Sequence, residues 1–193
     1  SRPTIGEKYI VIGLGLLGQI TCEILNANGC KVVGIDKDPR RVKSATNNNI
    51  ESYLLSDFSI HNNLNNFDAS LICTSSINSE PIEISSEILR KKGRIIILGT
   101  IEGKFNRDKF YYKELELKVS CSYGPGRYNK NYEIEGLDFP IEYVRWTEKR
   151  NFETILNLLE QNKINLRKFI TNVFNFTDFI NAYEVSTSDS NQL

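Results

Sequence analysis

The sequence predicts a doubly wound α/β fold: a parallel sheet of about six strands with helices on both faces, followed by a helix-strand-helix extension. Strand-like apolar segments alternate with amphipathic helical segments over the first hundred residues. A glycine-rich turn joins the first strand to the first helix. The fifth strand is almost pure isoleucine and leucine, which is typical of a strand covered on both faces. Right-handed crossovers are expected throughout.

Seven segments have the composition of strands, since each is an apolar run bounded by turn-forming residues. The sixth shows partial alternation, with one side expected to carry Leu115, Leu117, Val119 and Cys121. Residues 124–142, rich in Tyr, Gly, Asn and Pro, are expected to form an extended loop. The predicted strands are Lys8–Ile12, Lys31–Ile35, Glu51–Leu55, Ala69–Thr74, Arg94–Leu98, Lys113–Tyr123 and, in the extension, Phe169–Phe174.

Helix limits are predicted from capping residues. Asp38 and Pro39 offer an N-cap and a first helical residue, and Gly29 and Gly93 are expected as left-handed residues behind two helix ends. The core-facing residues are expected to be Leu17, Ile20, Ile24 and Leu25 in the first helix, and Ile84, Ile88 and Leu89 in the third. The predicted helices run from the glycine turn to about Asn28, over Arg40–Thr46, from Ser79 to Lys92, over Asn151–Gln161, and from about Thr177 onward.

The turn after the first strand fits the spacing G-x-G-x-x-G of a dinucleotide-binding loop, with glycines at Gly13, Gly15 and Gly18. Gly13 would allow the tight turn, Gly15 the approach of a pyrophosphate, and Gly18 close packing of helix on strand. Free N–H groups at the helix start, at Leu16 and Leu17, would bind the phosphates. A glycine turn that binds nothing is the alternative, and the strand before the turn and the helix after it argue against that alternative.

An acidic residue after the second strand predicts the choice of cofactor. Asp36 would accept hydrogen bonds from the adenosine ribose and repel a 2′-phosphate, so NAD(H) is expected to bind better than NADP(H). Lys37 and Arg41 follow closely and would soften this preference, and Lys37 is also a candidate to pack along the adenine. Arg40 is expected at a solvated helix start.

Ligands of doubly wound sheets lie across the carboxyl ends of the strands. This rule places Thr74, Ser75 and Ser76, after the fourth strand, beside the ribose and nicotinamide. It also places Gly99 and Thr100, after the fifth strand, in the same part of the site.

The composition excludes several classes of function. The 24 basic and 24 acidic residues give a formal charge of zero, so nothing indicates a nucleic-acid partner. No apolar run approaches the roughly 18 residues of a membrane span, and no signal-peptide pattern opens the chain. A soluble, cytoplasmic protein without a membrane partner is therefore predicted.

The four cysteines, Cys22, Cys30, Cys73 and Cys121, lie in apolar segments without metal-ligand spacing and are expected to be buried free thiols. Cys73 sits at the rim of the predicted site, where a buried thiol is favoured over a redox role. His61 lies in a polar connector and is expected at the surface. No catalytic residue and no metal ligand is assigned within this chain.

Several segments together resemble the nucleotide-binding domain of the medium-chain, zinc-type alcohol dehydrogenase superfamily. They are VIGLGLLGQ, VVGIDKDPRRV, DASLICTSS and ILRKKGRIIILGT, with KELELKVSCSYG similar to its sixth strand and LLEQNKINLRKFITNVFNFTDFINAYE to its closing helix, strand and helix. The resemblance covers residues 8–187 and implies a Rossmann fold. YGPGRY and FPIEYVRWTEKRN further resemble bacterial bi-domain oxidoreductases, in which such a half precedes one of the glucose–fructose oxidoreductase type.

The resemblance also implies where the chemistry lies. Members of the superfamily carry the catalytic zinc ligands, or the residues that replace them, in a separate β-rich domain that mostly precedes the nucleotide-binding part. Only Ser1–Glu7 precede the first strand here, and the chain does not begin with methionine. We therefore expect residues 8–187 to be an NAD(P)-binding domain from a longer enzyme, inactive alone, with residues 1–7 an interdomain remnant and 188–193 a frayed or truncated end. Any zinc would belong to the missing domain.

Alternative functions stay open at this point. The leading hypothesis is the cofactor-binding domain of an oxidoreductase for a small, sugar-related alcohol or carbonyl. An NAD(H)-sensing module of potassium-transport systems is the alternative, because VVGIDKDPRRVKSA resembles such domains, although ILRKKGRIIILG and the long tail argue against it. A scaffold that has lost its ligand is disfavoured by the intact glycines. In the superfamily the edge that corresponds to residues 115–123 often pairs across a two-fold axis, which implies a homodimer.

Overall fold

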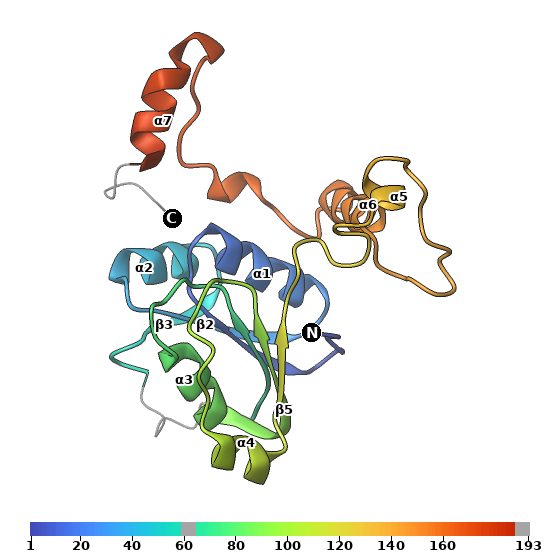
Figure 1. Cartoon of the computed structure of the whole chain (residues 1–193). Helices are drawn as coiled ribbons and strands as arrows, with labels where there is room; N and C mark the ends of the chain where they lie inside the picture. The colour runs from blue at the N-terminus through green and yellow to red at the C-terminus, as the bar shows by residue number, and fades with distance from the viewer. Residues whose placement is uncertain (59–64, 188–193) are drawn as a thin grey trace.

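The computed structural model describes residues 1–58 and 65–187, which contain one sheet of six parallel strands in the order β3-β2-β1-β4-β5-β6 (Figure 1). The order reverses between β1 and β4, which is the switch point of a doubly wound sheet. The predicted fold class is thus confirmed. The strands are β1 Lys8–Ile12, β2 Lys31–Asp36, β3 Glu51–Leu54, β4 Phe67–Ile72, β5 Leu89–Ile97 and β6 Glu116–Val119.

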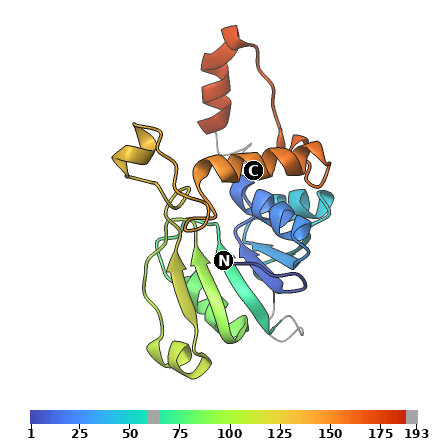
Figure 2. The same ribbon diagram turned by 90° about the vertical axis from the view of Figure 1, so that its right-hand side faces the viewer.

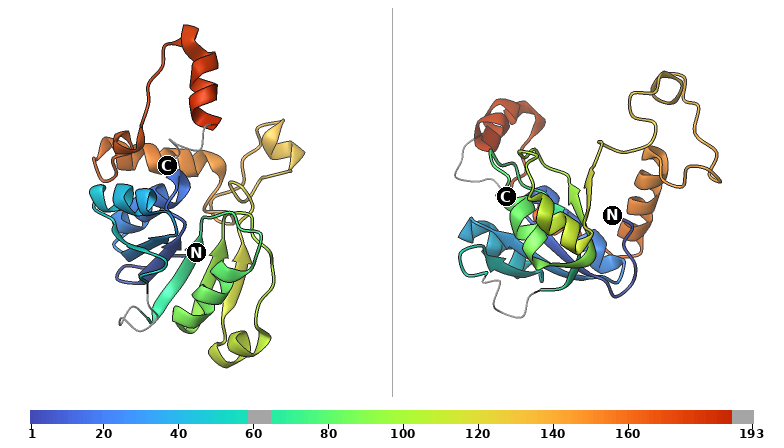
Figure 3. Two further views of the ribbon diagram at one scale, coloured as in Figure 1. Left: turned by 90° about the vertical axis from the view of Figure 1, so that its left-hand side faces the viewer. Right: turned by 60° about the horizontal axis from the view of Figure 1, so that its bottom comes forward.

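Helices cover both faces of the sheet: α1 and α2 lie on one face, and α3 and α4 on the other (Figures 1 and 3). The later helices α5, α6 and α7 lie beyond the carboxyl ends of the strands, and α7 stands apart from the body in Figures 1 and 2. The helices are α1 Leu16–Ala27, α2 Pro39–Asn47, α3 Glu80–Ile88, α4 Arg107–Lys113, α5 Lys130–Glu133, α6 Glu148–Glu160 and α7 Phe179–Thr187, with 3₁₀ turns at Arg167–Phe169 and Phe176–Asp178.

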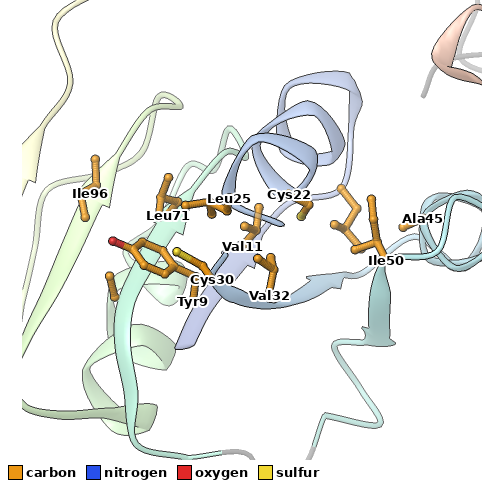
Figure 4. Packing of buried hydrophobic residues seen from close by; sticks show 12 residues of the cluster. Tyr9, Val11, Cys22, Leu25, Cys30, Val32, Ala45, Ile50, Leu71 and Ile96 are labelled. Atoms are coloured by element: carbon orange, nitrogen blue, oxygen red, sulfur yellow. The ribbon is translucent and has the colours of Figure 1, made fainter. Parts of the chain in front are cut away.

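Successive side chains of the central strand enter two different cores. Tyr9 and Val11 of β1 pack with Cys22 and Leu25 of α1 (Figure 4), whereas Ile10 packs into the cluster that α3 closes on the opposite face. Tyr9, Val11 and Ile10 are fully buried. Because both faces of the strand are covered, β1 has an unbroken apolar sequence instead of an alternating one.

The apolar face predicted for α1 is right at Leu25, which is buried, but wrong at Leu17; Ile20 and Ile24 are only partly buried. Its buried residues are Gly18, Gln19, Cys22 and Leu25, whereas Leu17 is 50% exposed. Gly18 sets the face, because a Cβ at this position would lie only 1.8 Å from the carbonyl oxygen of Gly13. Cys22 and Leu25, four and seven residues later, lie on the same side of the helix as Gly18 and therefore face the sheet.

The end predicted for the third helix is also wrong. α3 ends at Ile88 instead of Lys92, and the left-handed residue is Lys92 (φ 59°), not Gly93. Lys113 Nζ explains the early end, because it donates to the carbonyl oxygens of Ser86 (2.8 Å), Glu87 (2.6 Å) and Leu89 (2.9 Å). A lysine side chain thus satisfies carbonyls that a glycine cap would otherwise expose.

The sixth strand is shorter than predicted, because Lys113 belongs to α4 and only Glu116–Val119 pair with β5. Of the four residues predicted on its apolar side, only Leu115 packs on the core. The other three residues, Leu117, Val119 and Cys121, are exposed. β6 is an edge strand, and α3 and α4 pack on β4 and β5 rather than on β6.

Two further corrections concern the later part of the chain. The strand predicted over Phe169–Phe174 is absent: Phe169 ends a 3₁₀ turn, and residues 170–174 have no regular structure and pair with no strand. Lys168 ties this segment to the helices, because its Nζ lies 2.5 Å from Glu23 Oε1 on α1 and 3.0 Å from Asn48 O behind α2. α4 was not predicted, and neither was α5, which interrupts the loop predicted over 124–142 and whose start is capped by the side chain of Asn129.

All four cysteines are free, but only Cys22 and Cys30 are buried. Cys73 is partly buried, and Cys121 is exposed because it follows the edge strand. The prediction for His61 lies outside the described residues.

Across residues 1–58 and 65–187, no helix has both the length and the apolar character that crossing a membrane requires. The N-terminal segment Ser1–Glu7 contacts the domain through the Gly6 N–H, which donates to Gly29 O (2.8 Å). The predicted division into residues 1–7, 8–187 and 188–193 stays a prediction.

Candidate dinucleotide site

The glycine turn connects the end of β1 to the start of α1 and lies against the end of β4. Gly13 has a φ of +97°, and its N–H donates to Ile35 O (2.9 Å) on β2. A Cβ at Gly13 would lie 2.9 Å from both the Cβ and the backbone nitrogen of Thr74. Glycine is therefore required here for two reasons, the left-handed backbone and the close approach of β4.

The first turn of α1 has free backbone N–H groups. Its N-cap is Gly15, with an extended backbone; no side chain of the described residues caps the helix, and its first turn contains no acidic residue. Leu16 and Leu17 are about half exposed, so this first turn lies at the surface. Uncapped N–H groups at the positive end of a helix dipole are what an anionic diphosphate requires.

Asp36 lies beside this helix start, at the end of β2, and is buried. Its Oδ2 accepts from Leu14 N (2.7 Å) and its Oδ1 from Asp38 N (2.8 Å). Arg41 Nη1 is 3.8 Å from Asp36 Oδ2. Since a carboxylate has about four acceptor sites, two hydrogen bonds leave capacity for ribose hydroxyl groups.

The basic residues after β2 differ in their surroundings. Arg40 is exposed and pairs with Asp38 (2.8 Å), in agreement with the predicted solvated helix start. Arg41 is more enclosed, and its Nε is buried with no hydrogen-bond partner among the described residues. A buried donor left without a partner is unfavourable, so Arg41 has a donor available for a further polar group near Asp36.

A crevice with a cavity volume of about 50 Å³ opens at the carboxyl ends of β1, β2 and β4. Its polar wall contains residues that were predicted from the sequence, and its apolar wall contains Leu55, Pro81 and Ile84, which were not assigned to the site. A signal was present for two of them, because Leu55 ends the predicted third strand and Pro81 opens the helix after the fourth. The lining residues are Ile12, Gly13, Ile35, Asp36, Lys37, Leu55, Thr74, Ser75, Ser76, Glu80, Pro81 and Ile84.

The loops after β4 and β5 are held together at the same edge. A Cβ at Gly99 would lie 2.0 Å from Thr74 O, so the two loops touch. Thr100 O accepts from Ser76 N (2.9 Å). The structure thus brings all the predicted site residues to one edge of the sheet; that they bind a cofactor stays a prediction.

One buried polar residue in the site was missed. Gln19 is fully buried, and its Nε2 donates to Leu14 O (2.9 Å) within the glycine turn. The signal was a single amide directly behind the third glycine, on a helix whose other sheet-facing residues are small or apolar.

Thiol and metal chemistry are not indicated at this edge. Burial raises the pKa of the Cys73 thiol to about 11, and burial also raises the pKa of Cys22. Both thiols therefore keep their protons at neutral pH. Within the described ranges, no group of three or more His, Cys, Asp or Glu side chains is placed to hold a metal ion.

Comparisons with known proteins agree with this geometry. A family model described as zinc-binding dehydrogenase matches residues 17–135. L-galactonate-5-dehydrogenase of Escherichia coli (strain K12) is 25% identical over 185 residues, which are 89% of this chain and 52% of that protein.

Solved structures share the fold. A structure from Escherichia coli CFT073, described as a short chain alcohol dehydrogenase with NADH, is 16% identical with a TM-score of 0.71, over 95% of this chain and 49% of that one. Benzyl alcohol dehydrogenase from Acinetobacter calcoaceticus is 14% identical with a TM-score of 0.72, over 95% and 47%. L-idonate 5-dehydrogenase from Escherichia coli K-12 is 18% identical with a TM-score of 0.66, over 93% and 46%.

The chain therefore spans about half the length of the relatives it matches. The family match covers more than half of the chain and includes the helix of the glycine turn, Asp36 and the strands β2 to β6. This favours the oxidoreductase hypothesis over a regulatory module of potassium transport. The chain belongs to the zinc-binding dehydrogenase family and corresponds to its cofactor-binding part.

Proposed function

We propose that this chain binds NAD(H) as the cofactor-binding domain of an oxidoreductase acting on an alcohol or carbonyl group of a small sugar-related molecule. One observation carries the proposal: the uncapped start of α1 lies beside the buried carboxylate of Asp36, at the switch point of the sheet. A diphosphate and a ribose are the adjacent groups that such a pair of features recognises.

The described residues fit the two ends of the cofactor differently. The diphosphate would lie on the N–H groups of the first turn of α1, and the adenosine ribose on Asp36. Adenine would contact the apolar wall of the crevice, formed by Leu55, Pro81 and Ile84, with Lys37 at its edge. The nicotinamide half would extend toward Thr100 and supply hydride transfer when bound. The role of this chain is to bind and orient the cofactor.

The balance of charge supports NAD(H) over NADP(H). A 2′-phosphate would approach the Asp36 carboxylate, whose two hydrogen bonds to backbone N–H groups hold it in the site. Arg41 opposes this preference in part, because its guanidinium lies beside the same carboxylate. Similar structures contain either cofactor: the one from Escherichia coli CFT073 is with NADH, and a zinc-binding dehydrogenase from Sinorhizobium meliloti 1021 is with NADP.

The relatives support a sugar-related substrate for the whole protein. Two are named for L-galactonate and L-idonate, and a further similar structure is a D-arabinose dehydrogenase. This chain covers about half of each, and its described residues offer no set of metal ligands. Substrate polarisation, with zinc or without it, is therefore assigned to protein outside this chain. The bi-domain arrangement suggested by YGPGRY stays a prediction.

The edge strand supports a homodimer. The four residues of β6 are all exposed, and Val119 is 68% exposed. Across the described residues this edge carries no further strand. Two copies could pair along β6 about a two-fold axis and continue the sheet.

Titration of the whole chain with NADH and with NADPH, by calorimetry, tests the cofactor assignment. NADH is expected to bind more tightly. Asp36→Ala should bring the two affinities closer, and should also weaken both, because Asp36 holds the Leu14 N–H. Glu153→Gln, a similar loss of charge on exposed α6, is the control. No binding of NADH at millimolar concentration, or tighter binding of NADPH to the unaltered chain, would overturn the proposal.

A further inference from the structure

The geometry points to Gln19 as a positioning residue that sets the diphosphate-binding conformation of the glycine turn. This inference rests on the proposed function, since it concerns the same site. It also adds a residue that the G-x-G-x-x-G pattern does not include, because Gln19 follows the last glycine.

The turn is held on both sides of Leu14. The Leu14 N–H donates to Asp36 Oδ2 (2.7 Å), and the Leu14 carbonyl accepts from Gln19 Nε2 (2.9 Å). Leu14, Asp36 and Gln19 are all buried, so water does not compete for these bonds. The two peptide groups that flank Leu14 therefore have fixed orientations, and they connect Gly13 to Gly15, where the phosphates would approach.

The amide of Gln19 is itself oriented. Its Oε1 accepts from Asn48 Nδ2 (3.0 Å) at the end of α2, and its Nε2 lies 3.4 Å from Ser44 Oγ. The Asn48 carbonyl in turn accepts from Lys168 Nζ (3.0 Å). Because Asn48 occupies the acceptor side of the amide, the donor side must face Leu14.

A purely structural role does not explain this choice of residue. A fully buried helix position facing the sheet is ordinarily filled by an aliphatic side chain, and burying an amide there is unfavourable unless each polar atom is bonded. Gln19 meets that condition with one partner in the glycine turn and others on α2. The amide is therefore used to fix the turn rather than to fill space.

Three probes separate positioning from general stability: NADH, ADP and adenosine. ADP carries the diphosphate, whereas adenosine lacks it and touches only the Asp36 side of the site. Gln19→Leu, and Gln19→Glu, which keeps the shape but donates no hydrogen bond when ionised, should each weaken NADH and ADP about tenfold. Adenosine affinity should stay unchanged. Thr21→Val, which removes a hydrogen bond from Thr21 Oγ1 to Leu17 O on the same helix, is the matched control and should change none of the three.

The outcomes distinguish a failure of the proposed cofactor binding from a failure of the role inferred for Gln19. If the unaltered chain binds none of the probes, the proposed function fails. If it binds them and Gln19→Leu loses ADP and adenosine equally, or loses neither, the inference about Gln19 is overturned. A second measurement needs no ligand: the backbone amide NMR signals of Gly13 and Gly15 should shift or broaden in Gln19→Leu and not in Thr21→Val. Unchanged glycine signals would also overturn it.

Discussion

The part of the chain up to β6 and the part after it are built in different ways. In the first, strands and helices enclose two cores, and residues such as Ile10, Ile72 and Ile95 have no exposed surface. In the second, α6 and α7 contain no buried residue, and Tyr143, Val173 and Phe176 are each more than 80% exposed. Both parts have defined helices, so regular structure alone does not indicate a core.

The later part is held together by aromatic and polar contacts. Tyr132 stacks on Phe139 with ring centroids 5.7 Å apart, and Arg127 lies over the ring of Tyr128. Arg150 donates to Val144 O (2.5 Å) and Phe139 O (2.6 Å). A surface with this many exposed aromatic and aliphatic side chains is typical of a contact face for other protein. The first part folds around its own core, whereas the second part exposes an apolar surface of the kind that contacts other protein.

Two phenylalanines test this difference with the same chemical change. Phe67 begins β4 and is 3% exposed, whereas Phe176 is 92% exposed. Phe67→Ala should lower the free energy of unfolding by about 3–5 kcal/mol, because it leaves a cavity beneath α3. Phe176→Ala should change it by less than about 0.5 kcal/mol. Chemical denaturation at low protein concentration measures both, and equal losses would show that the later part has a core after all.

The sequence predicted the first part well because its signals are local. Asp38 and Pro39 mark the start of α2, and the Asp38 side chain does accept from Arg40 N (2.9 Å). The predictions failed where a contact with a residue far along the chain determines the structure of a segment. The end of α3 depends on Lys113, which lies about 25 residues further along the chain, and no pattern near Gly93 reveals it. The strand predicted over Phe169–Phe174 had the right composition, but Lys168 holds this segment against α1 and the end of α2 instead of a strand.

The candidate site was predicted in outline for a similar reason. Gly13, Gly18 and Asp36 are recognisable by spacing, because the turn imposes strict steric limits on two of them. Ile84 was missed because it looks like an ordinary core residue of a helix until the fold brings it to the crevice. Gln19 was missed because its signal, a lone amide behind the third glycine, does not reveal its partner Leu14. Packing partners far apart in sequence cannot be read from periodicity.

Two cations test whether polar contacts stabilise the parts differently. Lys113 Nζ donates to three carbonyl oxygens around the end of α3, and Arg150 holds the loop before α6 in a similar way. Lys113→Met should lower the free energy of unfolding by about 1–3 kcal/mol, because the partly buried carbonyls of Ser86 and Leu89 lose a charged donor. Arg150→Met should leave the unfolding of the sheet unchanged and instead speed proteolysis within residues 138–147. Lys109→Met, which breaks only an exposed pair with Glu87, is the control. If Arg150→Met lowers sheet stability as much as Lys113→Met, the two parts unfold as one unit.

The smallest expected effect is on acid stability, and it too should come from the first part. Burial acts to raise the pKa of Glu7, but the Thr4 N–H and the guanidinium of Arg94 outweigh it and hold the pKa below its ordinary value. A carboxyl whose folded pKa is lowered stabilises the protein above the ordinary pKa of 4.5, and this contribution is lost as the pH falls through the folded value.

Glu7→Gln should therefore lower stability by about 1 kcal/mol at pH 7, and the difference from the unaltered chain should vanish at acid pH. Glu133 offers the comparison, because the Tyr123 hydroxyl and Arg127 lower its pKa as well, but on the exposed face of the later part. Glu133→Gln should leave the pH dependence of global unfolding unchanged, because the contacts of Glu133 lie outside the cores that unfold. Thermal unfolding of both variants from pH 3 to pH 7 makes the test. A pH dependence that changes with Glu133 and not with Glu7 would reverse the assignment of stability to the first part.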